Sequence, residues 1–221
     1  MINAVFFDLD GTLADTAPDL AAALNIQLGR HNKPELPYDR IRPVVSHGGN
    51  ALIKLGFEIE ENDPEFAALR NEFLEIYQNN LCHASVLFPG MEKVISELEN
   101  KNITWGIITN KPGWLTEPLI IELGLDSRAA CVISGDSTEQ RKPHPAPMEL
   151  ANQLTGTSAR HSLYIGDAER DIQAGKSAGM YTLVALYGYI SNVDNPRSWQ
   201  ADGMIEQPAD IISWISCHSS K

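Results

Sequence analysis

The chain has 221 residues, 43% of them hydrophobic, which suits one large domain or a core domain with a small insert and excludes a disordered chain. Its net charge of −12, from 29 acidic and 17 basic residues, argues against nucleic acid or an anionic membrane surface as a partner, because both require a basic face. Three scattered cysteines, no leader-like N-terminus and no apolar run of about 20 residues predict a cytoplasmic protein without a membrane-spanning segment.

Short apolar runs recur along the chain, and a helical pattern follows each of them. The runs are rich in β-branched and aromatic residues, as expected for buried parallel strands. The predicted strands are residues 2–7, 103–108, 131–134, 163–165 and 181–186. The predicted helices of this part are 90–101, 113–123, 145–154, 169–178 and 209–217. The alternation predicts an α/β fold with a Rossmann-like, doubly wound parallel sheet.

One long stretch after the first strand interrupts the alternation. It has no convincing strand and is far longer than an ordinary connection. Its helical patterns cover 18–28, 38–45, 50–55 and 65–81. In the last pattern, apolar residues recur at steps of three and four, as in core packing: Phe66, Leu69, Phe73, Tyr77 and Leu81. We therefore predict a helical domain at 15–84, inserted into a core domain made of 1–14 and 85–221.

The first strand ends in two carboxylates, within the segment VFFDLDGTLADT at residues 5–16. Asp8 and Asp10 are two residues apart, and nothing nearby in the sequence offers them a positive partner. Like charges repel and are costly to desolvate unless a cation or a reaction uses them. A polar turn with a helix cap at Asp15 or Thr16 explains those two residues but leaves Asp8 without a role.

Polar residues also follow the later strands. In open α/β sheets, ligands bind beyond the carboxyl ends of the strands. Thr109 and Asn110 follow the second strand, Asp167 follows the fourth with Asp171 four residues on, and Lys142 precedes a helix. Taken singly, the first three are equally explained as helix caps and Lys142 as a solvated lysine. Together they indicate one site at the rim of the sheet.

Four segments resemble the four motifs of the haloacid dehalogenase (HAD) superfamily, in its phosphatase branch: DLDGTLADT, ITNK, RKP and GDAERD. The resemblance covers the whole chain, and the helical insert is similar to the C1 cap of that family. It implies a Mg²⁺-dependent phosphatase with a Rossmann-like core, acting on a small-molecule phosphate monoester.

The resemblance implies a role for each matching residue. Asp8 is the expected nucleophile, since a carboxylate ionised at neutral pH needs no base to activate it. Asp10 is the expected general acid and base. Mg²⁺ is expected to bind Asp8, Asp167 and the backbone carbonyl of Asp10, with Asp171 in support. The residues expected to hold the phosphoryl oxygens are Thr109, Asn110 and Lys142.

The sequence is compatible with two substrates, both of them phosphate esters that carry a carboxylate. The segments DGTLADTAPDL and IRPVVSHGGNALI resemble phosphoglycolate phosphatases, whereas EFLEIYQ, WGIITNKP and YGYISNVDNPRSWQAD are closer to the bacterial N-acetylmuramic acid 6-phosphate phosphatases of cell-wall recycling. Arg42 is a candidate partner for the substrate carboxylate, and a surface arginine before Pro43 is an equally good interpretation. Ser46 and His47 are further candidates for substrate specificity.

Two other functions fit parts of the pattern. A HAD-type phosphomutase uses the same motifs but hands the phosphoryl group to a second sugar rather than to water. A receiver-like signalling module also combines acids, Mg²⁺, a threonine and a lysine on an open α/β sheet. The helical insert has no place in a receiver, and a stable phospho-aspartate would favour one. The oligomeric state is expected to be a monomer or a homodimer.

Overall fold

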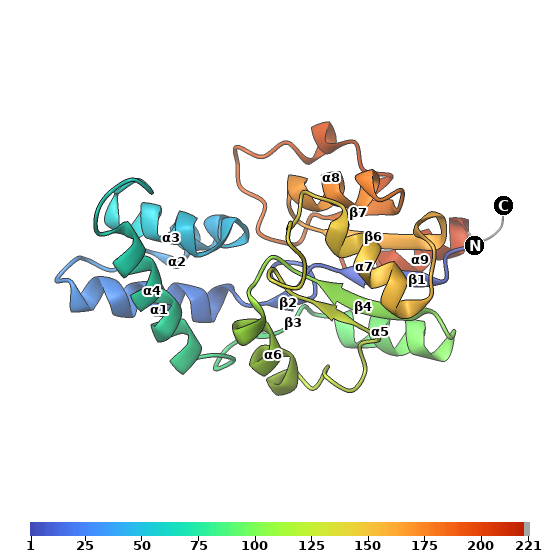
Figure 1. Ribbon diagram of the computed structural model, residues 1–221, viewed down its shortest axis with the longest axis horizontal. Helices are drawn as coiled ribbons and strands as arrows, with labels where there is room; N and C mark the ends of the chain where they lie inside the picture. Colours follow the sequence, from blue (N-terminus) through green and yellow to red (C-terminus); the bar gives the residue numbers. More distant parts are fainter. Residues whose placement is uncertain (219–221) are drawn as a thin grey trace.

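The computed structural model describes residues 1–218, and its centre is a parallel sheet with the strand order β5-β4-β1-β6-β7-β8. The strands are β1 Ala4–Phe7, β4 Thr104–Ile108, β5 Val132–Ile133, β6 Ser162–Gly166, β7 Tyr181–Ala185 and β8 Gly203–Ile205. The sheet and the helices around it confirm the predicted α/β, doubly wound fold (Figure 1).

Strand β1 lies between β4 and β6. Its last residue, Phe7, is in register with Ile107 of β4 on one side and with Ile165 of β6 on the other. The connections from β1 therefore lead to neighbouring strands on both of its sides. In a sheet with this topology, a crevice forms at the carboxyl end of the strand where the direction reverses. The residues that follow these three strands are brought to the same edge.

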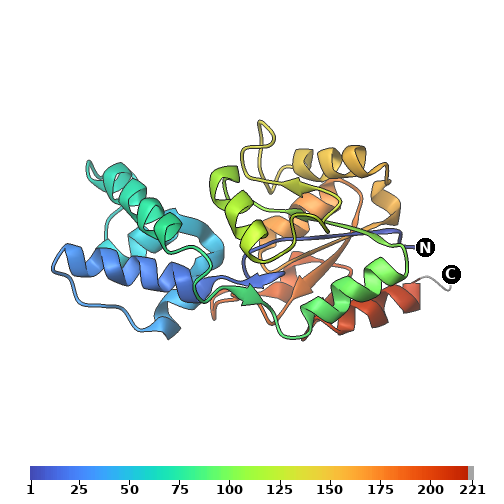
Figure 2. The same ribbon diagram turned by 90° about the horizontal axis from the view of Figure 1, so that it is seen from below.

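Helices cover both faces of the sheet. They are α5 Met91–Asn100, α6 Gly113–Glu122, α7 Ala146–Thr155, α8 Glu169–Ser177 and α9 Asp210–His218. Side chains of a strand alternate between faces, so Val5 and Phe7 belong to a core with α5 and α9, whereas Phe6 belongs to a core with α7 and α8. Helices α5 and α9 lie side by side below the sheet in Figure 2.

A second, helical lobe, called the cap here, stands beside the sheet domain (Figure 1). It consists of α1 Ala17–Arg30, α2 Tyr38–Ile41, the 3₁₀ helix η1 Arg42–His47, α3 Gly48–Phe57 and α4 Phe66–Asn79. Where the chain enters and leaves the cap, β2 Ala14–Asp15 pairs antiparallel with β3 Val86–Leu87. The cap is thus joined to the sheet domain through a short two-stranded ribbon.

Several elements differ from the predicted ones. The helix expected over 38–45 is one α-helical turn followed by η1, because Pro43 has no N–H to donate to the carbonyl four residues before it. Strands β2, β3 and β8 were not predicted, since two or three residues are too short for a period-2 pattern. Two further 3₁₀ turns, η2 Ala159–His161 and η3 Pro196–Trp199, complete the described chain.

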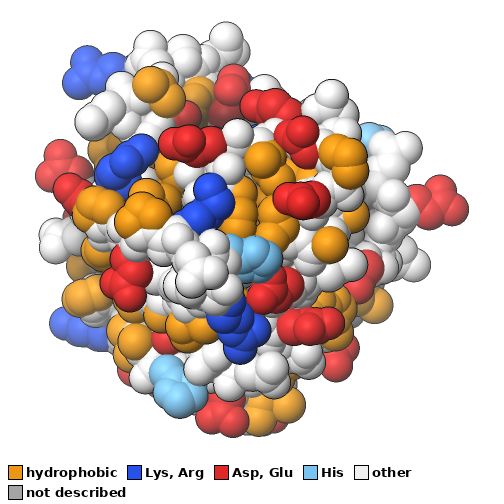
Figure 3. Space-filling view, turned by 90° about the vertical axis from the view of Figure 1, so that its left-hand side faces the viewer, with side chains coloured by type: hydrophobic (Ala, Val, Ile, Leu, Met, Phe, Trp, Pro, Cys, Tyr) orange, Lys and Arg blue, Asp and Glu red, His pale blue; other side chains and the backbone are white. Residues whose placement is uncertain are grey.

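The outer end of the cap has a mixed surface. In Figure 3, Lys and Arg side chains are interspersed with Asp and Glu and with apolar groups. Among the helices of residues 1–218, none combines the length and apolar character needed to cross a membrane.

Candidate active site

A cleft of about 640 Å³ separates the carboxyl edge of the sheet from the cap. The predicted residues that line it from the sheet domain are Asp8, Asp10, Thr109, Asn110 and Lys142. Ser46 and His47 line it from the cap, whereas Arg42 is not among its lining residues. The cleft is therefore where groups from the ends of β1 and β4 face the inserted helices.

Lys142 is completely buried and links two of the acids. Its Nζ lies 2.9 Å from Asp8 Oδ1 and 2.8 Å from Asp171 Oδ1, and it donates hydrogen bonds to the Ile108 carbonyl and the Tyr164 hydroxyl. Burial opposes the ammonium, but the carboxylates of Asp171 and Asp8 raise the pKa of Lys142 above its usual value. This excludes the solvated-lysine interpretation and places a fixed positive charge beside Asp8.

Asp8, Asp167 and Asp171 form a buried acidic cluster. One carboxylate oxygen from each lies within 4.8 Å of the others. Burial raises the pKa of Asp8 from 3.8 to about 7, opposed by Lys142 and reinforced by the other two acids. Burial and the charge of Asp171 raise the pKa of Asp167 to about 6. Three buried oxygen donors whose charges repel form a donor set that suits a hard divalent cation such as Mg²⁺.

The Asp167 carboxylate receives hydrogen bonds from three segments. Oδ2 accepts from the Ser46 hydroxyl of the cap at 2.5 Å and from the Tyr189 N–H at 2.9 Å, and Oδ1 accepts from the Thr12 hydroxyl at 3.3 Å. The Arg170 guanidinium donates to the Ser46 carbonyl. Ser46, predicted as a specificity residue, thus contacts a predicted metal ligand and connects the cap to it.

Glycines allow the close approach of these acids. Gly11 has φ +84°, and a Cβ there would collide with the Asp167 carboxylate. A Cβ on Gly166 would likewise collide with Asp171. The glycines in the DGT and GD segments are therefore required by the packing of the acidic cluster, as well as by the turn at Gly11.

Asp10 has partners of its own, different from those of Asp8. Lys111 Nζ lies 2.9 Å from Asp10 Oδ1, and the Thr16 hydroxyl donates to the same oxygen at 2.5 Å. Thr16 occupies the N-cap position of α1, but its side chain makes no capping hydrogen bond. The two acids that lack a positive partner in the local sequence thus each receive one from the fold, Lys111 for Asp10 and Lys142 for Asp8.

Thr109 and Asn110 do not cap α6, whose N-cap residue is Pro112. Asn110 Nδ2 donates to the Lys142 carbonyl at 2.9 Å, and its Oδ1 accepts from the Lys142 N–H at 3.1 Å. The amide therefore locks the Lys142 loop against the end of β4. The buried Thr109 hydroxyl accepts a hydrogen bond from the Lys111 N–H at 3.1 Å. Asp167 is likewise not the N-cap of α8, a position taken by Ala168.

Arg42 connects the cap to the loop after β7. Its guanidinium donates to the carbonyls of Gly188 at 3.0 Å and Tyr187 at 3.2 Å, and it lies over the ring of Tyr189. Its predicted contact with a substrate carboxylate stays a prediction that these contacts do not support. His47 does line the cleft, and burial together with the Arg170 guanidinium lowers the pKa of its imidazole.

The cleft is also lined by polar side chains to which the sequence gave no part in the site, among them Arg70, Tyr77, Lys111 and Arg141. Lys111 is part of the ITNK segment, but only the fold brings it to Asp10. Tyr77 was assigned to the apolar stripe of α4, and its ring does lie in the core, yet Lys111 Nζ sits 4.7 Å from the ring centre. Helical spacing from Phe73 and Tyr77 is the signal that places Arg70 on the same face.

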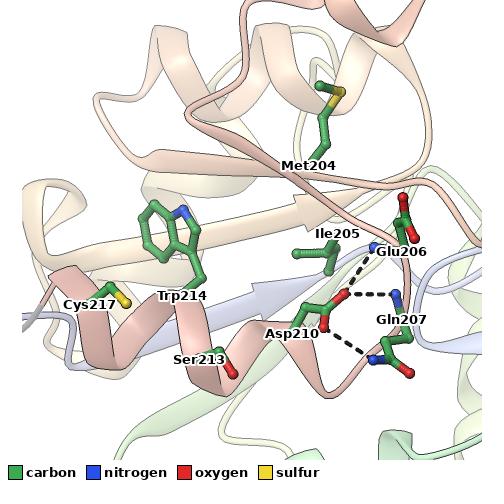
Figure 4. A pocket seen from close by; sticks show the side chains of 8 residues that line it. All are labelled: Met204, Ile205, Glu206, Gln207, Asp210, Ser213, Trp214 and Cys217. Carbon is green, nitrogen blue, oxygen red and sulfur yellow. Dashed lines mark hydrogen bonds between the residues drawn. The ribbon is translucent and has the colours of Figure 1, made fainter.

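A larger pocket, of about 740 Å³, lies elsewhere, along α9 (Figure 4). Its acids are Glu206 and Asp210, and Asp210 accepts the N–H groups of Glu206 and Gln207 at the start of α9. None of the predicted site residues lines it. The convergence of charged groups therefore selects the cleft under the cap as the candidate active site.

Comparisons with known proteins give the family of this chain. Residues 5–185 match the family of haloacid dehalogenase-like hydrolases. A phosphoglycolate phosphatase of Xanthomonas campestris is 42% identical, covering 95% of this chain and 94% of its own. An N-acetylmuramic acid 6-phosphate phosphatase of Pseudomonas putida is 39% identical, again covering 95% of this chain and 94% of its own. The crystal structure of a predicted phosphoglycolate phosphatase from Haemophilus somnus superposes with a TM-score of 0.85 and 28% identity, covering 97% of this chain and 98% of that one.

The family match spans most of the chain, and the named relatives cover nearly all of it at about 40% identity. The relatives are named phosphatases, and the fold is shared along the whole length. These findings confirm the resemblance seen in the four motifs: the chain is an enzyme that belongs to the haloacid dehalogenase-like hydrolase family.

Proposed function

We propose that this enzyme is a Mg²⁺-dependent phosphatase that hydrolyses a small phosphate monoester through a phosphoryl group carried on Asp8. The observation that carries the proposal is the position of Asp8, which lies at the end of the central strand between the Lys142 ammonium and two further buried carboxylates. The metal site is proposed at Asp8, Asp167 and the backbone carbonyl of Asp10, with Asp171 in support. Bound Mg²⁺ would neutralise charge on the phosphate that these acids face.

Each residue of the cleft has a part in the proposed reaction. An Asp8 carboxylate oxygen attacks phosphorus, a P–O bond forms to Asp8, and the bond from phosphorus to the ester oxygen breaks. Asp10 gives its proton to the departing oxygen. Water then attacks phosphorus and gives a proton to Asp10, and the P–O bond to Asp8 breaks, which releases inorganic phosphate and the free carboxylate. The transferring phosphoryl oxygens are bound by Thr109, Asn110 and Lys142.

We also propose that residues 15–84 act as a lid on this reaction. The cap meets the sheet domain at the β2–β3 ribbon, and it reaches the acidic cluster through the Ser46–Asp167 hydrogen bond. Rotation about the ribbon would admit the substrate, and closure would exclude bulk water during transfer. A disulfide or chemical crosslink that holds the cap open should then abolish turnover.

The proposed substrates are N-acetylmuramic acid 6-phosphate and 2-phosphoglycolate, because relatives of nearly equal identity are named for each. The first would place this enzyme in the cytoplasmic recycling of peptidoglycan, and the second in metabolite salvage. The test is phosphate release from each ester in the presence of Mg²⁺, with the metal-free enzyme as the blank. Release from neither ester, together with a long-lived phosphate on Asp8, would contradict the proposal and favour a phosphomutase or a signalling module.

Removal of divalent metal should destabilise the protein more at pH 8 than at pH 5. The raised pKa values of Asp8 (about 7) and Asp167 (about 6) mean that the metal-free folded state holds more protons than the unfolded state, whose carboxyl groups titrate near 3.8. Its stability therefore falls as pH rises from about 4 to about 7, by linkage. Mg²⁺ at 100 times its dissociation constant should restore about 2.7 kcal/mol at pH 8.

The measurement is the melting temperature in EDTA and in Mg²⁺ at both pH values. K⁺ at matched ionic strength is the control for general screening of charge. The same melting temperature in EDTA and in Mg²⁺ at pH 8 would contradict a metal site at the acidic cluster.

A further inference from the structure

The cap side of the cleft carries a basic side chain without an acidic partner. Arg70 of α4 lines the cleft and is half-buried. Its Nε donates to Asn50 Oδ1 at 2.7 Å, which orients the guanidinium, and within residues 1–218 no carboxylate forms an ion pair with it. A guanidinium held in this way has its two terminal nitrogens available for a planar anion.

The other lysine and arginine side chains of the cleft are already engaged or lie at its phosphate end. Lys111 and Lys142 are paired with Asp10 and Asp8, and the Arg170 guanidinium donates to a cap carbonyl. Arg141 is exposed and adjoins Lys142, at the phosphate end. Glu61 also lines the cleft, and its carboxylate is paired with Lys54 at 3.5 Å.

One face of α4 spans the cleft from the reacting acids to Arg70. Tyr77 marks the inner end, because its ring lies against Lys111, the partner of Asp10. Arg70 precedes Tyr77 by seven residues, so the two side chains are separated by about 10 Å along the helix axis. Between them, Phe73 and Leu74 present an apolar surface to the cleft.

Tyr77 is the polar group at the inner end of this face. Its side chain is 1% exposed and lines the cleft, and its hydroxyl lies within reach of the Lys111 ammonium, whose positive charge opposes the rise in the pKa of Tyr77 that burial causes.

We propose that Arg70, oriented by Asn50, binds a carboxylate that lies across a sugar-sized body from the phosphate. The inference rests on the proposed phosphatase function and selects its substrate class. The carboxylate of 2-phosphoglycolate is a few bonds from phosphorus, too close to cover the rise of about 10 Å along α4 between Tyr77 and Arg70. In N-acetylmuramic acid 6-phosphate, the phosphate and the lactyl carboxylate lie on different sides of a pyranose ring, whose apolar face can pack on Phe73 and Leu74.

The test compares two sugar phosphates that differ only in the lactyl group, which carries the carboxylate. N-acetylglucosamine 6-phosphate has the ring, amide and phosphate of N-acetylmuramic acid 6-phosphate but no lactyl group. The enzyme should prefer the muramic acid ester in kcat/KM by about 10- to 100-fold, the range of a charge-assisted hydrogen bond. Arg70→Met should abolish this preference, mainly through KM, and leave turnover of the glucosamine ester unchanged.

Three variants make the test specific. Arg70→Lys keeps the charge without the planar fork and should retain only part of the preference. Arg40→Met replaces an exposed arginine of α2 outside the cleft and should leave kcat/KM unchanged for both esters. Arg141→Met should leave the preference intact, because Arg141 adjoins the phosphate end.

The outcomes separate this inference from the proposed function. Three results would overturn the role of Arg70 without touching the phosphatase activity. In Arg70→Met, the preference could stay unchanged, or kcat/KM could fall equally for both esters. Alternatively, the preference could be lost in Arg141→Met rather than in Arg70→Met. Absence of phosphate release from all three esters by the unmodified enzyme would overturn the proposed function itself.

Discussion

Asp8→Asn should reduce phosphate release by at least about 10⁴-fold, the scale of losses when a covalent nucleophile is removed. The amide keeps the shape of the carboxylate but cannot attack phosphorus. Lys142 retains Asp171 as a buried partner, so the variant should fold. In EDTA at pH 8 it should be at least as stable as the unmodified protein, because one of three repelling carboxylates is gone.

The measurements are phosphate release and the mass of the protein after rapid acid quenching. The unmodified enzyme should carry one added phosphoryl group during turnover, and Asp8→Asn should carry none. Asp126→Asn, in the exposed turn after α6, is the matched control and should behave as the unmodified enzyme. Full activity in Asp8→Asn would reject the assignment of the nucleophile.

Lys142→Met should lower kcat by about 10²- to 10³-fold, as expected when a preorganised donor to the transition state is removed. It should also destabilise the metal-free protein by about 3–5 kcal/mol at pH 8, since Asp8 and Asp171 are left buried without their cation. Protonation of these carboxyl groups removes their unpaired negative charge and therefore reduces the loss of stability. Because burial already raises the pKa of Asp8, the loss of stability should shrink as pH falls toward about 5.

Urea unfolding in EDTA at pH 5 and pH 8 measures this effect. Lys101→Met is the control, because Lys101 pairs with Glu97 on the exposed surface of α5 and such pairs contribute about 0.5 kcal/mol or less. A loss of stability that is the same at both pH values would show that Lys142 acts through packing rather than through its charge.

The apolar pattern was sufficient to predict every strand of the described sheet except β8, because its information is local. Each parallel strand is buried on both faces and therefore reads as a short apolar run, and the residue after the run is known once the run is found. Asp8, Thr109 and Asp167 were assigned to the carboxyl ends of strands in this way. The order of the strands, with β1 in the middle, is what makes these ends adjacent.

Local signals also failed for identifiable reasons. Strand β8 and the β2–β3 ribbon are held by pairing with segments far along the chain, so three residues or fewer suffice in the fold but give no period in the sequence. No local pattern indicates that the Arg42 guanidinium contacts the carbonyls of Tyr187 and Gly188, because these residues are 145 and 146 positions away in the sequence.

By itself, the sequence determined the architecture and the kinds of groups at the sheet edge, because strand periodicity, turn glycines and the DxD spacing are short-range properties. The tertiary structure alone decided which charges meet: Lys142 with Asp8 and Asp171, Lys111 with Asp10, and Arg70 with no carboxylate of residues 1–218. Charge pairing depends on burial and on distances of a few ångströms between side chains. Asp10 and Lys111, for example, are more than 100 positions apart in the sequence. No local sequence pattern encodes such a contact.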